Sequence, residues 1–168
     1  PEALLEKKIA TYREKLEEHP DRFAYRFQLA RHLHLRGAAD NEDAAKEALK
    51  RLEDLHDDYP DRPIITSYYG AAMVLSAKRQ FFTWDKMDHL KEGRSLLNQA
   101  IEQADDPYLP RLFRGITAAH LPKKLDQREA AFEDLQWAVK HASEKLEKDV
   151  IRPDQAAAAH YHFAHLLA

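Results

Sequence analysis

The chain of 168 residues has four glycines, no cysteine and a formal net charge of −3 from 26 basic and 29 acidic side chains. The β-branched residues Val, Ile and Thr total 13, whereas Ala and Leu total 47, which argues against strand-rich folds. The lack of cysteine excludes disulfide-stapled modules and thiolate metal sites. Basic and acidic residues are mixed along the chain without a cluster of Lys or Arg, so nucleic acid is not an expected partner.

The first half of the chain carries start and stop signals for helices at short intervals. We expect helices over residues 2–18, 22–36, 42–58 and 63–78. Asp21 and Asn41 are the expected N-terminal caps of the second and third helices, and Gly37 is the expected stop of the second. Pro63 falls in the first turn of the fourth helix, where its missing N–H costs nothing.

The second half predicts four more helices, over residues 85–104, 106–120, 127–148 and 153–168. Asp85 is the expected cap of the fifth helix, and Asp126 and Glu129 have the spacing of a capping box for the seventh. Eight helices joined by short loops leave almost no residues for strands. The sequence therefore predicts one all-α domain over residues 1–168.

Small residues recur at matching places in alternate helices. Ala30, Gly70, Gly115 and Ala164 each follow a longer residue, at spacings of 40, 45 and 49. The companion helices carry a small residue followed four positions later by Leu, beginning at Ala48, Gly93 and Ala131. Two antiparallel helices that cross closely need a small residue in each at the crossing. We therefore predict that Gly70, Gly93 and Gly115 lie at helix crossings.

Together with the boundary residues Pro20, Pro60 and Pro107, this pattern resembles the tetratricopeptide repeat (TPR) family over essentially the whole chain. The resemblance implies a right-handed helical-repeat solenoid of about eight antiparallel helices. Its repeat units would be about 21–60, 61–107 and 108–152, flanked by helix 2–18 and helix 153–168. The repeats are longer than the family's period of about 34 residues, because the connectors 37–41 and 79–84 are long.

The sixth helix departs from the family pattern, because Arg111 and Arg114 stand where the family usually has apolar residues. In one interpretation the register of this helix is rotated, since an alternative apolar stripe is present at Leu109, Leu112, Phe113 and Ile116. In the other, the two arginines face a partner. The rotated register is the favoured interpretation.

In the TPR family the first helix of each pair lines a concave surface that holds peptides. The resemblance therefore implies a binding groove lined by Phe27, Arg31, His34, Tyr68, Phe113, Ile116, His120, Tyr161 and His162. The family's cationic clamp for a C-terminal carboxylate is not expected, because its aligned positions hold Phe27, Gln28, Tyr68, Leu109 and Phe113. An aromatic groove suits an apolar segment or an amphipathic helix. The same side chains could instead pack within the solenoid.

Ten histidines suggest an alternative, a ligand- or metal-responsive domain or weak hydrolase that uses the last helix. His162 and His165 share a helix face there, whereas His160 points elsewhere, and zinc needs a third protein ligand. The chain has no G-x-S-x-G motif and no group of glycines that could cradle a phosphate. We therefore expect a non-enzymatic interaction module for a protein or peptide, without metal or cofactor.

The sequence leaves undecided the role of the aromatic connector, the packing of the last helix and the compartment of the protein. Phe81, Phe82 and Trp84 either plug a gap between helices or anchor a partner, which includes a second copy of the chain. The apolar residues Phe163, Leu166 and Leu167 either pack inward, meet a continuing chain or form a homodimer contact. The longest uncharged stretch, 63–77, has 15 residues and is too short to span a bilayer. No secretory signal is visible, but the chain begins at Pro1, so a soluble protein of the cytoplasm or the periplasm is expected without a choice between them.

Overall fold

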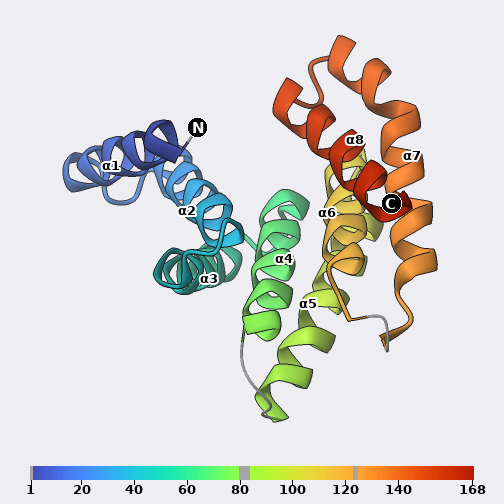
Figure 1. Cartoon of the computed structure of the whole chain (residues 1–168). Coiled ribbons are helices and arrows are strands. Elements are labelled where there is room, and N and C mark those ends of the chain that lie inside the picture. Colours follow the sequence, from blue (N-terminus) through green and yellow to red (C-terminus); the bar gives the residue numbers. More distant parts are fainter. Residues whose placement is uncertain (1, 80–83, 123–124) are drawn as a thin grey trace.

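The computed structural model describes residues 2–79, 84–122 and 125–168, with 78, 79 and 84–86 described by their backbone alone (Figure 1). Every regular element of this part is a helix, so the predicted all-α fold is confirmed. The helices are α1 (Glu2–Glu18), α2 (Phe23–Ala38), α3 (Glu42–Asp58), α4 (Pro63–Arg79), α5 (Trp84–Gln103), α6 (Tyr108–Ala119), α7 (Arg128–Glu147) and α8 (Pro153–Leu167).

The helices pack as successive pairs. The most extensive contacts join α2 with α3, α4 with α5 and α6 with α7, while α1 packs on α2 and α8 on α7. The alternate helices also touch in sequence, α2 with α4, α4 with α6 and α6 with α8. In Figure 1, α1–α3 lie on one side of α4 and α6–α8 on the other. This contact pattern is consistent with a helical repeat.

Glycines lie at the crossing inside each pair. A Cβ atom on Gly70 of α4 would lie 2.7 Å from the carbonyl oxygen of Gly93 on α5, and a Cβ on Gly115 of α6 would lie 3.0 Å from Leu135 Cγ on α7. The prediction for these three glycines is confirmed. The prediction that Gly37 stops α2 is wrong. Gly37 lies inside the helix, where a Cβ would come within 2.7 Å of Ala45 Cα on α3, so it too serves a close crossing.

One of the four predicted helix caps is correct. Asn41 Oδ1 accepts a hydrogen bond from the backbone N–H of Ala44 at 2.8 Å, as an N-cap does. Asp21 is not a cap, because Arg22 occupies the N-cap position of α2 and no side chain bonds the first turn.

The other two caps are also wrong. Asp126 has a φ of 48°, in the left-handed region, and precedes the N-cap residue Gln127 of α7, where no side-chain cap bond forms. Helix α5 begins at Trp84, so Asp85 falls inside the helix rather than at its cap. The starts of α2, α5 and α7 differ from the expectation by only one or two residues, which is enough to remove a cap.

The last helix packs its apolar side inward. Phe163 and Leu166 are partly buried against a core formed by α6 and α7, and the ring of Phe163 lies 5.4 Å from that of Phe132. Leu167 remains 60% exposed. The inward-packing alternative therefore holds for two of these residues, and a homodimer through α8 stays a prediction.

The aromatic connector lies outside the described residues, which include neither Phe81 and Phe82 nor the side chain of Trp84. Within the described ranges, no helix combines the length and the apolar character needed to cross a membrane.

Candidate functional site

The four alternate helices line one cavity of about 350 Å³, which we call the concave cavity. Its walls are formed by His34 and Ala38 of α2, Ala71, Val74 and Leu75 of α4, Ile116 and Thr117 of α6, His120 and Leu121 just after α6, and Tyr161 and His162 of α8. Five of the nine residues expected to line a groove are therefore brought together here: His34, Ile116, His120, Tyr161 and His162. Four of them come from the C-terminal half of their helix, and His120 directly follows the last residue of α6.

Two histidines of the concave cavity are strongly perturbed by burial. Burial lowers the pKa of His34 to about 4, and its Nδ1 is buried with no hydrogen-bond partner among the described residues. Burial, followed by the charges of His120 and His165, lowers the pKa of His162 to about 4. Both rings are therefore neutral near pH 7, which keeps the cavity wall largely apolar.

His162 also contacts His120 at the edge of the cavity. The two rings meet edge to face, with His120 Nε2 3.3 Å from His162 Nδ1. Within the described residues, no group of three His, Asp or Glu side chains is arranged to hold a metal ion. A zinc site needs at least three protein ligands, so the contact between these two rings gives the metal-responsive alternative no complete site.

Three other expected groove residues form a cluster of rings instead. The centroid of Tyr68 lies 5.4 Å from that of Phe27 and 4.6 Å from that of Phe113. Tyr68 is only 4% exposed. These rings come from the N-terminal halves of α2, α4 and α6 and fill the space there, so they pack within the repeat rather than line the cavity.

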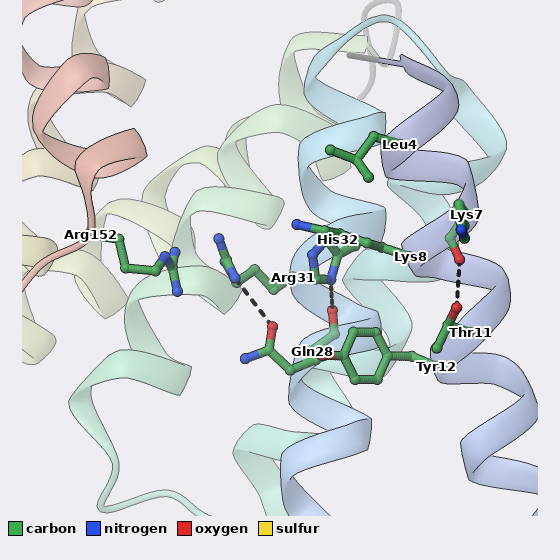
Figure 2. Close-up of a pocket in the computed structure, with 9 residues that line it drawn as sticks. All are labelled: Leu4, Lys7, Lys8, Thr11, Tyr12, Gln28, Arg31, His32 and Arg152. Carbon is green, nitrogen blue, oxygen red and sulfur yellow. Dashed lines mark hydrogen bonds between the residues drawn. The ribbon is translucent and has the colours of Figure 1, made fainter.

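Arg31, the ninth expected residue, lies in a second pocket of about 440 Å³ (Figure 2), which we call the basic pocket. Its walls are Leu4, Lys7, Lys8, Thr11 and Tyr12 of α1, Gln28, Arg31 and His32 of α2, and Arg152. Arg31 Nη1 donates to Gln28 Oε1 at 3.2 Å and Nη2 donates to Asp154 Oδ2 at 3.3 Å. Sequence reasoning missed Arg152, because no sequence spacing relates this loop residue to α1 and α2.

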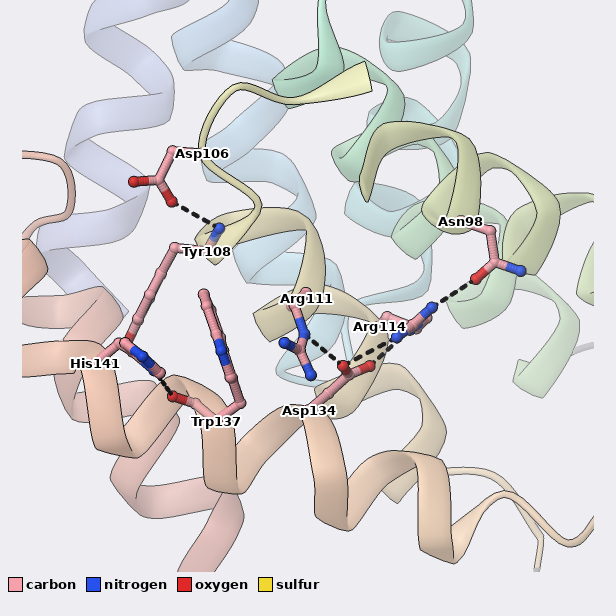
Figure 3. A network of polar contacts seen from close by, with 8 residues as sticks. All are labelled: Asn98, Asp106, Tyr108, Arg111, Arg114, Asp134, Trp137 and His141. Atoms are coloured by element: carbon pink, nitrogen blue, oxygen red, sulfur yellow. Dashed lines mark hydrogen bonds and ion pairs between the residues drawn. The ribbon is translucent and has the colours of Figure 1, made fainter. Parts of the chain in front are cut away.

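Arg111 and Arg114 both pair with a carboxylate inside the fold (Figure 3). Arg111 Nε donates to Asp134 Oδ1 at 2.9 Å, and Arg114 Nε donates to Asp134 Oδ2 at 2.6 Å. Asp134 lies on α7 and is 1% exposed. Arg114 also donates to Asn98 Oδ1 on α5. The neighbouring helix therefore supplies a partner for both arginines within the fold, and their contact with a separate protein stays untested.

The apolar stripe of α6 takes the place that the favoured register assigned to it. Leu112 is buried, and Leu109, Phe113 and Ile116 pack against the cores on either side. Arg111 stays beside this core by lying over the ring of Trp137, with its guanidinium carbon 4.4 Å from the ring centroid (Figure 3). The two arginines thus join α6 to α7 without entering the apolar core.

Comparison of the sequence with protein families, with curated proteins and with solved structures finds no match in any of the three. The concave cavity and the basic pocket are therefore the features of this chain that bear on its function.

Proposed function

We propose that the protein is a non-enzymatic interaction module that holds one large apolar side chain of a protein or peptide partner in the concave cavity. The observation that carries this proposal is that α2, α4, α6 and α8 all contribute walls to one cavity of about 350 Å³. That volume lies near the lower end of ligand pockets, about 300–1,000 Å³. It has room for an anchor side chain and not for a whole helix.

The chemistry of the walls supports an apolar anchor. Ala71, Val74, Leu75 and Ile116 supply apolar surface, and Thr117 adds a hydroxyl. An apolar pocket with a few polar groups at its edge is the usual seat of an anchor residue at a protein interface.

The direction of entry follows from what fills the rest of the concave side. The rings of Phe27, Tyr68 and Phe113 occupy the N-terminal halves of their helices. The exposed residues Ala38 and His120 lie at the C-terminal ends of α2 and α6. The partner would therefore approach from this end.

The same proposal treats the chain as a right-handed, TPR-like solenoid. What supports it is the pairing order of the helices, the small residues at their crossings and the cavity on the side of the first helix of each pair. A groove on that side is the general binding surface of stacked helical repeats.

Selection of peptides from a displayed random library tests the function. We expect the enriched peptides to share one large apolar residue, and we expect Ala38→Trp, which blocks the cavity at its exposed end, to weaken binding at least about tenfold. Ala157→Trp is the matched control, because Ala157 is exposed on α8 and does not line the cavity. Peptides that bind the Ala38→Trp variant as well as the unchanged protein would contradict the proposal.

The same assay distinguishes the proposed apolar anchor site from the metal-responsive alternative. Peptide binding that requires Zn²⁺ and is lost in His162→Ala would favour that alternative over a purely apolar anchor site. We expect chelation of divalent metals to leave peptide binding unchanged.

A further inference from the structure

The basic pocket collects positive charge without a matching set of carboxylates. Lys7, Lys8, Arg31 and Arg152 are four of the nine residues that line it, and none of the nine is Asp or Glu (Figure 2). His32 adds no charge near neutral pH, because burial lowers its pKa and the charges of Arg31, Lys8 and Arg152 lower it further. The positive charges of Arg31, Lys8 and Arg152 therefore all lie close enough to the buried ring of His32 to lower its pKa.

Arg31 is buried with part of its hydrogen-bonding capacity unused. The residue is 9% exposed, and its Nε has no hydrogen-bond partner among the described residues. Its side-chain bonds to Gln28 and Asp154 are long at 3.2 and 3.3 Å, and the hydroxyl of Tyr68 also contacts both Arg31 and Arg152. A buried guanidinium is costly unless its donors and its charge are matched by acceptors.

Arg152 faces Arg31 across the pocket. Figure 2 shows the two guanidinium groups pointing toward each other, from the loop before α8 and from α2. Asp154 is the carboxylate between them, accepting from Arg152 Nε at 3.0 Å and from Arg31 Nη2. One carboxylate on two guanidinium groups, with Lys8 nearby, leaves an excess of positive charge.

We propose that the basic pocket binds a phosphate monoester, held between the planar donors of Arg31 and Arg152 with Lys8 as a further cation. A phosphate monoester carries a charge near −2 at neutral pH and three acceptor oxygens, so it offsets the excess charge that Asp154 leaves and supplies acceptors for the guanidinium N–H groups that face the pocket. Guanidinium groups match phosphate geometry, whereas the lysine acts as a point charge. The ring of Tyr12, stacked on His32 at 5.5 Å, forms an apolar wall for the carrier of the phosphate.

The carrier is either a phosphorylated side chain of a protein or a small phosphorylated molecule, since both present the same group. Calorimetric titration at low ionic strength with inorganic phosphate, O-phosphoserine, glycerol 2-phosphate, a phosphoserine peptide and acetate tests the site. We expect the phosphate compounds to bind and acetate, a monoanion, to bind at least about tenfold more weakly. Binding should weaken as salt is added, because screening reduces the attraction.

Variants locate the binding. Arg152→Gln and Lys8→Gln change exposed residues, and we expect each to weaken phosphate binding about tenfold. Arg31→Lys keeps the charge but loses the planar fork and is expected to weaken binding while circular dichroism shows the same helix content. Lys50→Gln is the matched control, because Lys50 is exposed on α3 and outside the pocket.

The titrations distinguish a phosphorylated protein from a small phosphorylated molecule, and they also show whether the pocket binds phosphate at all. Tighter binding of the phosphoserine peptide than of glycerol 2-phosphate assigns a phosphorylated protein as ligand, and equal affinity assigns a small molecule. No saturable binding of any phosphate compound would overturn the proposal, as would an equal loss in Lys50→Gln and Arg152→Gln. Ala38→Trp should leave phosphate binding unchanged, so the basic pocket and the concave cavity are tested independently.

Discussion

The backbones of Gly70 and Gly93 are in direct contact, since a Cβ atom on either residue would lie 2.7 Å from the carbonyl oxygen of the other. Neither glycine has a positive φ. Their role is therefore close approach and not an unusual backbone conformation. This contact sets the separation of α4 and α5, which pack into one core, and α4 also lines the concave cavity.

Alanine at either position should destabilise the protein. In an ordinary helix, Gly→Ala stabilises by about 0.5–1 kcal/mol. Here the added methyl group meets backbone, and overpacking of this kind costs about 1–3 kcal/mol. We expect Gly70→Ala and Gly93→Ala to lower the free energy of unfolding, measured in urea, by about 2 kcal/mol. Ser143→Ala, exposed on α7, should change it by less than about 0.5 kcal/mol; a stabilised Gly70→Ala would disprove the close contact.

The two candidate caps of the N-terminal half should differ in their effect on stability. Asn41→Ala removes the side-chain oxygen that accepts from Ala44 N–H, and we expect a loss of about 1 kcal/mol. Asp21→Ala should change stability by less than about 0.5 kcal/mol, because the cap position of α2 is Arg22. Thermal unfolding of both variants measures the difference. A larger loss in Asp21→Ala than in Asn41→Ala would show that the helix starts are wrongly assigned.

The buried carboxylate of Asp134 should be among the most sensitive sites of the C-terminal half. Asp134→Ala leaves Arg111 and Arg114 without their shared partner, and breaking a buried ion pair from one side costs about 3–5 kcal/mol. The two arginines are partly exposed and can reach water, so we expect about 3 kcal/mol in urea unfolding. Glu133→Gln, one residue earlier and exposed, is the control. Equal effects of the two variants would show that the pairs with Asp134 add no stability.

Stability should fall as the pH is lowered from 7 to 5. The pKa of His34 and that of His162 are lowered by burial to about 4 in the folded state, whereas histidine in an unfolded chain titrates near about 6.5. The unfolded state therefore binds more protons below about pH 6.5, and the stability present above that pH is lost as the pH falls toward 4.

The size of this effect follows from the difference in bound protons. We expect the free energy of unfolding to fall by about 3 kcal/mol between pH 7 and pH 5, a range in which most carboxylates stay ionised. His34→Leu should reduce that fall by about 2 kcal/mol, and His160→Gln, exposed on α8, is the control. Unfolding curves in urea at several pH values make the comparison. A constant free energy of unfolding from pH 7 to pH 5 would contradict the burial of these two rings.

The sequence by itself determined the helices, because helix formation depends on neighbours only a few residues apart. The spacing of apolar residues, the prolines at the boundaries and a local cap such as Asn41 all act within one or two turns. The small residues at crossings were also predictable from the sequence, but for a different reason: a position that recurs from repeat to repeat marks a contact that recurs between helices. Gly37 was misassigned because a glycine near a helix end serves equally as a stop or as a close crossing, and its partner Ala45 decides between them.

The tertiary structure alone decided which distant side chains meet. Arg152 comes to Arg31 only because the stacked helices bring the start of α8 back to α2, and Asp134 meets Arg111 and Arg114 only at the crossing of α6 with α7. The nine expected groove residues likewise separated into a cavity, a ring cluster and a basic pocket. The physical reason is that such contacts depend on the rotation and separation of packed helices, which small residues far apart in the sequence set together.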